Sequence, residues 1–348
     1  FDKNNTPTTK VTTEKDKQTS LAYNHSVFTQ SFTQFQTHNH FYFTYSKMPC
    51  YDYNDNNDYE YDTMALDVIV EHLASMMKQE SSYQCNNYLC SDSNNDVVMR
   101  DVNDDNDDDD MMIDVACRTA MSSWMFTVVD TLQLPREAAT IAMSYVDRYV
   151  STSAGKVSRY DRTQYQLTCM ACFYTAVKVH SPVAIDPSLV SQLSRGAFTP
   201  AEIEEREVSV LIALKWKVNP PTVVCFLRYF HKILLSTFSG TDQDHTDFFQ
   251  AMIDLATYQA EVSTIDYHLS VAGNMKPSLI AFAALMNAME SISDDDNNDN
   301  MMDDNIRQKL IGRVAMVANL NVKMEDVLTA RTCLYEAVMG DAAGQLKP

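Results

Sequence analysis

The chain has 348 residues, of which 45% are hydrophobic and 21% charged, and its formal net charge is −20. This length is sufficient for one large core or two core-sized units, so we expect a globular chain. Only seven glycines occur, scattered along the sequence, so no loop can cradle a phosphate or dinucleotide as nucleotide-binding α/β enzymes do. No apolar run approaches the ~18 residues needed to span a membrane, and no membrane partner is expected.

The negative charge is concentrated in three stretches without lysine or arginine: residues 52–62, 101–110 and 294–304. Together they hold 18 of the 20 excess negative charges, so the rest of the chain is close to neutral. We interpret the runs as solvated loops rich in Asn and Asp, with attraction of a basic partner as the alternative. Because the remaining sequence has no basic stripe, we expect no nucleic-acid partner.

Helical periodicity begins after a polar tail, residues 1–61, whose Thr-, Ser-, Asn- and Gln-rich composition is typical of disorder. From Thr63, apolar residues recur three or four apart and predict a flanking helix that ends near Ser81. Beyond the acidic insert at 101–110, the same spacing predicts five more segments, at about 113–134, 135–149, 161–179, 187–193 and 199–216. The segment at 161–179 is apolar almost all round, which marks it as the central helix.

The pattern starts again, more weakly, after Pro221. Helices are expected at about 222–235, 244–262, 277–292, 306–320 and 322–339, the third and fourth separated by the acidic insert at 294–304. No strand pattern of period two is present. The sequence therefore predicts an all-α fold of two consecutive five-helix repeats, 62–220 with its N-terminal flanking helix and 221–340, and a C-terminal tail at 341–348.

The cysteines and histidines give no catalytic or metal-binding pattern. Cys117, Cys169, Cys172 and Cys225 lie in apolar helical patterns, as reduced core thiols do, which indicates an intracellular compartment. Cys169 and Cys172 have the spacing of a zinc knuckle, but no second pair accompanies them. No histidine has a glutamate three positions before it, as a helical di-metal site would require. We therefore expect no metal, no cofactor and no catalysis.

Four charged residues interrupt the apolar stripes: Arg118, Asp147, Lys178 and Glu207. An unpaired charge in such surroundings is costly, so each must pair internally, extend its charged end to solvent or meet a partner. Periodicity leaves two alternatives open. The charges form internal salt bridges that hold the helices in register, or a charged pair at the edge of the core grips another protein.

Residues from about 117 to 230 resemble the cyclin box. The motifs that carry this resemblance are Cys117–Met125 with its arginine and tryptophan, Ser144–Tyr149 with its Asp-Arg pair, Gln166-Leu167 with Ala176-Val177-Lys178, and Glu207 with Leu214-Lys215-Trp216. The segment Lys276–Ala281 loosely resembles the third helix of the C-terminal cyclin fold. Within the family, the residues around Trp124 and Trp216 resemble the G1, D-like type, although no Leu-x-Cys-x-Glu motif occurs. The Asn/Asp-rich inserts indicate a divergent lineage such as the diatom cyclins.

This resemblance implies two cyclin folds and a regulatory subunit that binds and allosterically activates a cyclin-dependent serine/threonine kinase in cell-cycle control. It implies that Arg118 and Asp147 form a buried structural ion pair, that Lys178 and Glu207 face the kinase, and that the protein is nuclear or cytoplasmic. The alternative is a role in transcription, as a transcriptional-type cyclin or as another cyclin-fold protein of the TFIIB type.

Cyclins also use a hydrophobic patch to dock substrates and inhibitors that carry a short basic-x-hydrophobic motif. The positions that match this patch are Cys117, Ala120, Met121, Trp124 and Gln166. Because Cys117 and Ala120 replace larger aliphatic residues, the apolar contact is smaller and we expect weak or altered docking.

Overall fold

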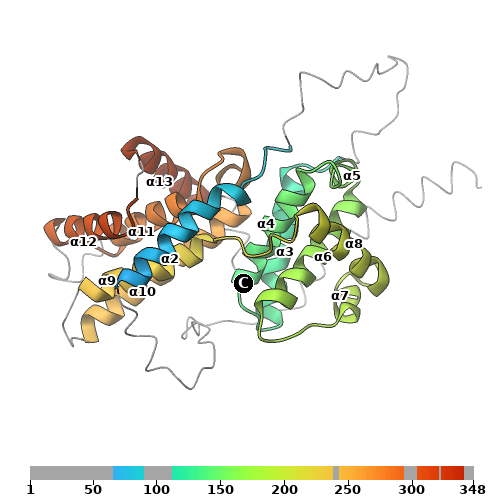
Figure 1. The fold of residues 1–348 in the computed structure, drawn as a ribbon, viewed down its shortest axis with the longest axis horizontal. Coiled ribbons are helices and arrows are strands. Elements are labelled where there is room, and N and C mark those ends of the chain that lie inside the picture. Colours follow the sequence, from blue (N-terminus) through green and yellow to red (C-terminus); the bar gives the residue numbers. More distant parts are fainter. Residues whose placement is uncertain (1–65, 90–111, 238–242, 294–303, 321–322, 341–348) are drawn as a thin grey trace, which may run out of the picture. The chain divides into compact units, whose positions relative to one another are not determined.

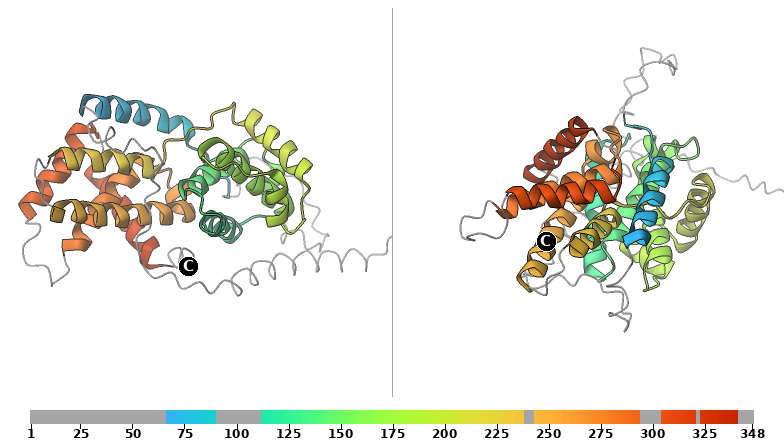
Figure 2. Two further views of the ribbon diagram at one scale, coloured as in Figure 1. Left: turned by 90° about the horizontal axis from the view of Figure 1, so that it is seen from below. Right: turned by 60° about the vertical axis from the view of Figure 1, so that its left-hand side comes forward.

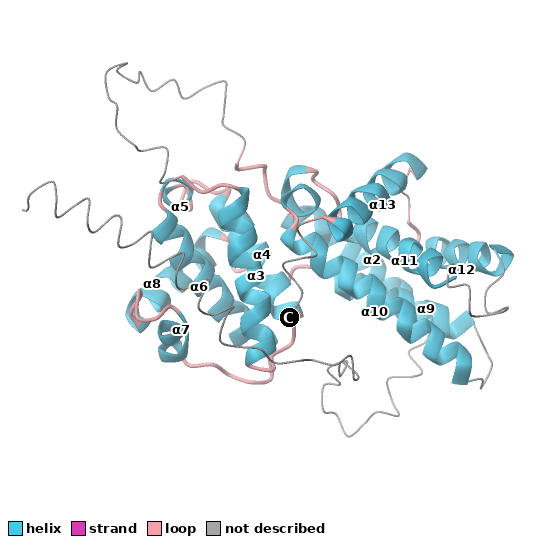
Figure 3. Ribbon diagram, turned by 180° about the vertical axis from the view of Figure 1, so that it is seen from behind, coloured by secondary structure: helices cyan, strands magenta, loops and turns pink. Residues whose placement is uncertain are grey.

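The computed structural model describes residues 66–89, 112–237, 243–293, 304–320 and 323–340. Every regular element in these ranges is a helix (Figure 3), which confirms the all-α prediction. The predicted tail at 1–61, the insert at 101–110, nearly all of the insert at 294–304, and residues 341–348 lie outside the described residues.

The first repeat is built around one central helix. Its elements are α3 (Val115–Thr131), α4 (Glu137–Val150), α5 (Val157–Tyr160), α6 (Arg162–His180), α7 (Pro187–Leu193) and α8 (Pro200–Ala213). Helix α6 packs against each of the other five (Figure 1), and its residues are buried almost continuously from Leu167 to Val177. The all-round apolar pattern of the sequence is therefore explained by neighbours on every side.

Caps fix where α6 and α8 begin. The Asp161 side chain accepts hydrogen bonds from the backbone N–H groups of Thr163 and Gln164, the first donors of α6. At α8, the Thr199 hydroxyl accepts from the Glu202 N–H at 3.3 Å, and the Glu202 carboxylate accepts from the Thr199 N–H at 2.7 Å. This capping box sets the register of α8 and thereby the position of Glu207.

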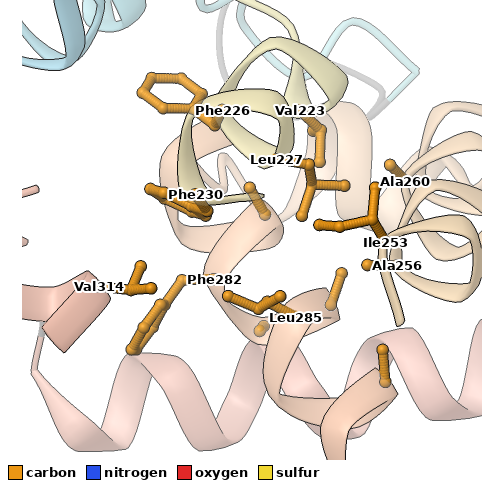
Figure 4. Packing of buried hydrophobic residues seen from close by; sticks show 14 of the residues in the cluster. Val223, Phe226, Leu227, Phe230, Ile253, Ala256, Ala260, Phe282, Leu285 and Val314 are labelled. Atoms are coloured by element: carbon orange, nitrogen blue, oxygen red, sulfur yellow. The ribbon is translucent and has the colours of Figure 1, made fainter. Parts of the chain in front are cut away.

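The second repeat contains α9 (Val223–Thr237), α10 (Gln243–Ile265), α11 (Pro277–Ser293), α12 (Asp304–Val317) and α13 (Met324–Met339), with the π-helical turn η4 (His268–Ala272) after α10. Figure 4 shows its core, where Phe230 of α9 meets Phe282 of α11 edge to face with ring centroids 6.4 Å apart. Such aromatic contacts add to the free energy gained from apolar burial.

The flanking helix α2 (Leu66–Glu80) packs against the second repeat. Ile69 and Leu73 are buried in the core formed by α9 and α11, and α2 lies along these helices in Figure 2. From the sequence, this helix is grouped with the first repeat, residues 62–220, because it comes before the other helices of that repeat in the chain. Periodicity shows that a helix has an apolar face, but not which neighbour that face contacts.

A buried carboxylate fixes the end of α2. Glu80 is 2% exposed, and its two oxygens accept from the backbone N–H of Ser278 at 3.1 Å and from the Ser278 hydroxyl at 3.0 Å. Ser278 lies in the first turn of α11, where backbone N–H groups lack helical partners and favour a negative charge. Burial raises the pKa of the Glu80 carboxyl, although the hydrogen bonds from Ser278 act to lower it. Helix α2 is thus held by apolar contacts along its length and a polar contact at its end.

Two charged residues at the start of α4, the N-cap Arg136 and the first helical residue Glu137, contact the second repeat. Arg136 donates to both oxygens of Glu261 on α10 at 2.8 Å, and Glu137 accepts from Arg228 on α9 at 2.7 Å. Burial would raise the pKa of Glu137, but the Arg228 charge and the hydrogen bond from Thr222 outweigh it, and the pKa is lowered. Two ion pairs of opposite polarity therefore join the start of α4 to the second repeat.

The position of α2 predicts which helices lose stability when its anchor is removed. Leu73 is fully buried, so Leu73→Ala should lower the free energy of unfolding by about 2–5 kcal/mol through lost contacts and a cavity. Hydrogen exchange measured by mass spectrometry should become faster in α9 and α11 and stay unchanged in α6. Val68→Ala, at an exposed position of the same helix, is the control. Faster exchange confined to the first repeat would contradict this placement of α2.

Candidate functional site

Arg118 of α3 and Asp147 of α4 are brought together inside the protein. Arg118 Nε lies 2.9 Å from Asp147 Oδ1, and Nη2 lies 2.8 Å from Oδ2, so the pair is bidentate. The arginine side chain has no exposed surface and the aspartate side chain is 7% exposed. Tyr88, in the segment that follows α2, donates its hydroxyl to Asp147 Oδ1 at 2.8 Å. The carboxylate is therefore held by two residues from different elements.

The remaining nitrogen of Arg118 reaches the second repeat. Nη1 donates to the backbone carbonyl of Ile265, the last residue of α10, at 2.9 Å, and the Tyr267 ring lies 5.6 Å from the guanidinium. Burial alone would lower the pKa of Arg118, but the charge and hydrogen bonds of Asp147 outweigh it and raise the pKa. One permanently charged side chain thus joins α3, α4 and the end of α10.

Lys178 of α6 and Glu207 of α8 also pair with each other, but at the edge of the core. Lys178 Nζ lies 3.1 Å and 3.2 Å from the two carboxylate oxygens of Glu207. The Glu207 side chain is 8% exposed, whereas the Lys178 side chain is 52% exposed. The hydrogen bond from Glu207 raises the pKa of Lys178, so the ammonium stays protonated. The carboxylate is held inside, and the ammonium reaches solvent.

Neighbouring side chains hold both members of this pair. The Thr175 hydroxyl contacts Glu207 Oε1 at 3.3 Å, and Lys178 Nζ lies 5.1 Å from the centre of the Tyr174 ring. A cation at this distance from an aromatic face is stabilised by the ring electrons. Glu207 and Tyr174 therefore position the Lys178 ammonium within the chain itself.

Exposed apolar side chains occur on the same two elements as this ion pair. They are Val179 and Val183 at the end of α6 and beyond it, Val208 and Ile212 on α8, and Trp216 just after α8. Trp216 is 68% exposed, and both Lys215 and Trp216 have a positive φ, which is costly for residues other than glycine. Exposed apolar side chains that lie together mark interaction sites, so Trp216 is a candidate contact for a partner.

Sequence reasoning did not single out Val208 and Ile212 as functional. The available signal was the breadth of the apolar pattern on α8, because Val208 and Ile212 lie on the helix in addition to Ile203 and Val210, which the core buries. A single core-facing stripe does not require this many apolar positions. An excess of apolar residues can therefore indicate a second contact surface.

The five residues of the predicted docking patch lie on α3 and α6 and differ in exposure. Cys117 and Met121 are buried, whereas Ala120, Trp124 and Gln166 are partly exposed. Trp124 packs edge to face on Phe173, with ring centroids 5.7 Å apart. The patch therefore offers less open apolar surface than the number of its residues suggests.

Neither a metal site nor a membrane span is found in the described ranges. No group of three or more His, Cys, Asp or Glu side chains there could hold a metal ion. Cys169 and Cys172 are buried free thiols, and burial raises the pKa of both. Among the helices that the structure describes, none combines the length and apolar character that crossing a bilayer requires.

A double-mutant cycle tests the Arg118–Asp147 pair. Arg118→Ala and Asp147→Ala should each lower the free energy of unfolding by about 3–5 kcal/mol, because each leaves its partner charge buried without compensation. In the double variant, the free energy of unfolding measured in urea should fall by less than the sum of the two single losses. Arg118→Lys keeps the charge but cannot donate to Asp147 and Ile265 together. Its free energy of unfolding should lie between those of wild type and Arg118→Ala. Strictly additive losses would contradict a direct interaction.

Comparisons with known proteins assign the sequence of this chain to a family. Residues 83–219 match the family model "Cyclin, N-terminal domain", and residues 221–306 match "Cyclin, C-terminal domain". Cyclin-A1-2 of Oryza sativa subsp. japonica is 28% identical over 176 residues, which is 50% of this chain and 33% of that protein. G2/mitotic-specific cyclin-B1 of Oryzias latipes is 26% identical over 168 residues, which is 48% of this chain and 37% of that protein.

Among solved structures, a viral cyclin from herpesvirus saimiri matches with a TM-score of 0.49 and 17% identity over 79% of this chain and 98% of that chain. The chain spans about a third of the length of the two curated relatives named above. These two are A-type and B-type cyclins, so the D-like subtype stays a prediction. The two family models adjoin at residue 220 and between them include α3 to α11 with both ion pairs. Because these two matches together span more than half of the chain, the chain belongs to the cyclin family.

Proposed function

We propose that this chain is a non-catalytic regulatory subunit that binds a cyclin-dependent serine/threonine kinase and activates it in cell-cycle control. The observation that carries the proposal is the Lys178–Glu207 pair, in which the lysine side chain is half exposed while the glutamate side chain is buried. Membership of the cyclin family supports a kinase as the partner.

Lys178 has the chemistry for gripping a partner while its ion pair stays intact. An ammonium group has three N–H donors, and the contacts to Glu207 leave capacity for a carbonyl or carboxylate of the kinase. Ile212 on α8 and Trp216 just after it are exposed and would add apolar contacts with a partner that covers this part of the chain. A charge-assisted hydrogen bond surrounded by apolar contacts is a strong anchor in protein interfaces.

Activation follows from a difference in affinity. A protein that binds the active arrangement of a kinase more tightly than the inactive one shifts the population toward the active state. A shift from 1% to 99% active requires an affinity ratio of about 10⁴. A rigid site is suited to this role, because it fits one arrangement of the partner and does not adapt to both.

Nuclear or cytoplasmic residence is part of the same proposal, since the kinase must be in the same compartment. The transcriptional alternative is not favoured, because the relatives named above include an A-type cyclin and a G2/mitotic-specific cyclin. The body of the chain between the acidic stretches also lacks the basic stripe that a DNA-binding member of the TFIIB type would need.

The docking patch on α3 and α6 belongs to this proposal as the site for partners with a basic-x-hydrophobic motif. Ala120 is partly exposed, so Ala120→Leu should enlarge the apolar contact and strengthen binding of a peptide with this motif by about fivefold, from the area gained. Isothermal titration calorimetry measures the change, with a peptide whose hydrophobic residue is replaced by serine as the control. An unchanged or weakened affinity would argue against docking at this position.

The kinase grip is tested by reversing one charge and then both. Lys178→Glu should abolish binding to, and activation of, every cyclin-dependent kinase that wild type binds in a panel of purified kinases. Lys178→Glu places a second carboxylate next to Glu207 and should lower the melting temperature. The double variant Lys178→Glu with Glu207→Lys restores opposite charges on α6 and α8 and should recover that lost thermal stability. It should not recover kinase activation, because the exposed charge is still reversed.

The matched control is Lys309→Glu, which reverses the charge of an exposed lysine on α12 of the second repeat. This variant should activate kinases as the wild-type protein does. Kinase phosphorylation of a histone peptide and surface plasmon resonance provide the two measurements. If Lys178→Glu activated a kinase to the wild-type level, or if the double variant regained activity along with stability, the pair would be structural and the proposed grip would be wrong.

A further inference from the structure

Helix α13 has one packed face and one apolar face that no described element covers. Its packed face consists of Val327, Ala330, Leu334 and Ala337, which are buried against α10 and α11. On the other face, Met324 is 65% exposed, Leu328 52%, Tyr335 61% and Met339 68%. We call these four residues the α13 stripe. Figure 1 shows α13 as an outer helix next to α11.

The four residues form a continuous surface feature. At about 100° per residue they fall within an arc of about 60°, and at about 1.5 Å per residue they extend over about 22 Å. Leu328, Thr332, Tyr335 and Met339 follow one another at spacings of four, three and four. This is the spacing of the contact seam between two packed helices, so a helix is the shape that fits the stripe.

The edge of the stripe is acidic. Glu325 and Glu336 are exposed and lie on the same side of it, by the helical periodicity of α13. Among the described residues, neither carboxylate takes part in an ion pair. Arg331, on the opposite edge, is already bound to Asn287 and Glu290 of α11. The charge that is not paired within the described residues is therefore the negative charge of Glu325 and Glu336, on one edge of the stripe.

These features select one kind of occupant. A second copy of the chain laid antiparallel on the stripe would bring its own acidic edge against this one, which is unfavourable. A helix with an apolar seam and basic residues along its flank would instead complement both the stripe and its edge. The family-model match to the C-terminal cyclin domain ends at residue 306, before α13, and the proposed kinase site lies on α6 and α8.

We propose that the α13 stripe is a docking surface for a basic amphipathic helix of a partner protein. The probes are two fluorescent helix-forming peptides with an identical leucine seam, one with lysine and one with glutamate along the flank that would face Glu325 and Glu336. Fluorescence anisotropy on the full chain should show about tenfold tighter binding of the lysine peptide, the effect of about 1.4 kcal/mol from two ion pairs at an apolar contact.

Matched variants locate the binding on α13. Leu328→Ala with Tyr335→Ala should weaken binding of the lysine peptide by about tenfold or more, as loss of central apolar contacts does. Glu325→Lys with Glu336→Lys should reverse the preference between the two peptides. The control is Val157→Ala with Tyr160→Ala, which removes exposed apolar side chains from α5 and should leave the affinity unchanged.

Three results would overturn the proposal. They are equal affinity for the two peptides, undiminished binding by the Leu328→Ala and Tyr335→Ala variant, and a dimer in sedimentation velocity that this variant abolishes. The test is independent of the kinase grip, because Lys178→Glu should bind the lysine peptide as wild type does. A failure here therefore leaves the proposed function untouched, and the reverse also holds.

Discussion

The fold depends on one buried cation that has to be fully satisfied. Arg118 has no exposed surface, and its nitrogens reach Asp147 on α4 and the Ile265 carbonyl at the end of α10. A buried guanidinium without partners is too costly to tolerate, so this cluster permits few arrangements of α3, α4 and α10. Tyr88, which donates to the same carboxylate, adds the segment after α2. Four parts of the chain are thereby fixed by one charge.

The same chemistry gives a different result at the edge of the core. Lys178 and Glu207 repeat the pairing of a cation with a carboxylate on two helices, but here the cation is half exposed. A fully buried pair can only hold helices together, whereas an exposed ammonium can also contact another protein. Burial, and not the identity of the charges, therefore separates a structural pair from a candidate binding pair. Arg118 joins α3 to α4, and α4 packs against α6, the helix that carries Lys178.

The sequence predicts the long helices well because their apolar patterns and caps are local. The Thr199–Glu202 capping box and the apolar circumference of α6 are examples. It misses α5 and the π-helical turn η4, which are four and five residues long and show no full period. It also shows that Lys178 and Glu207 interrupt apolar stripes, but not that they meet each other. Pairing, exposure and the neighbour of α2 depend on tertiary packing, which periodicity does not contain.

Where the acidic residues lie determines what they can do. Most of the −20 net charge comes from three Asn- and Asp-rich stretches, whose field is screened within about 10 Å at an ionic strength of 0.1 M. Glu325 and Glu336 contribute little to that total, but α13 holds them at a fixed distance from the stripe. Charges fixed beside an apolar seam select the orientation and sign of a partner, whereas a diffuse negative field mainly affects the rate of encounter. Local placement on a folded helix therefore matters more for specificity than the large overall charge.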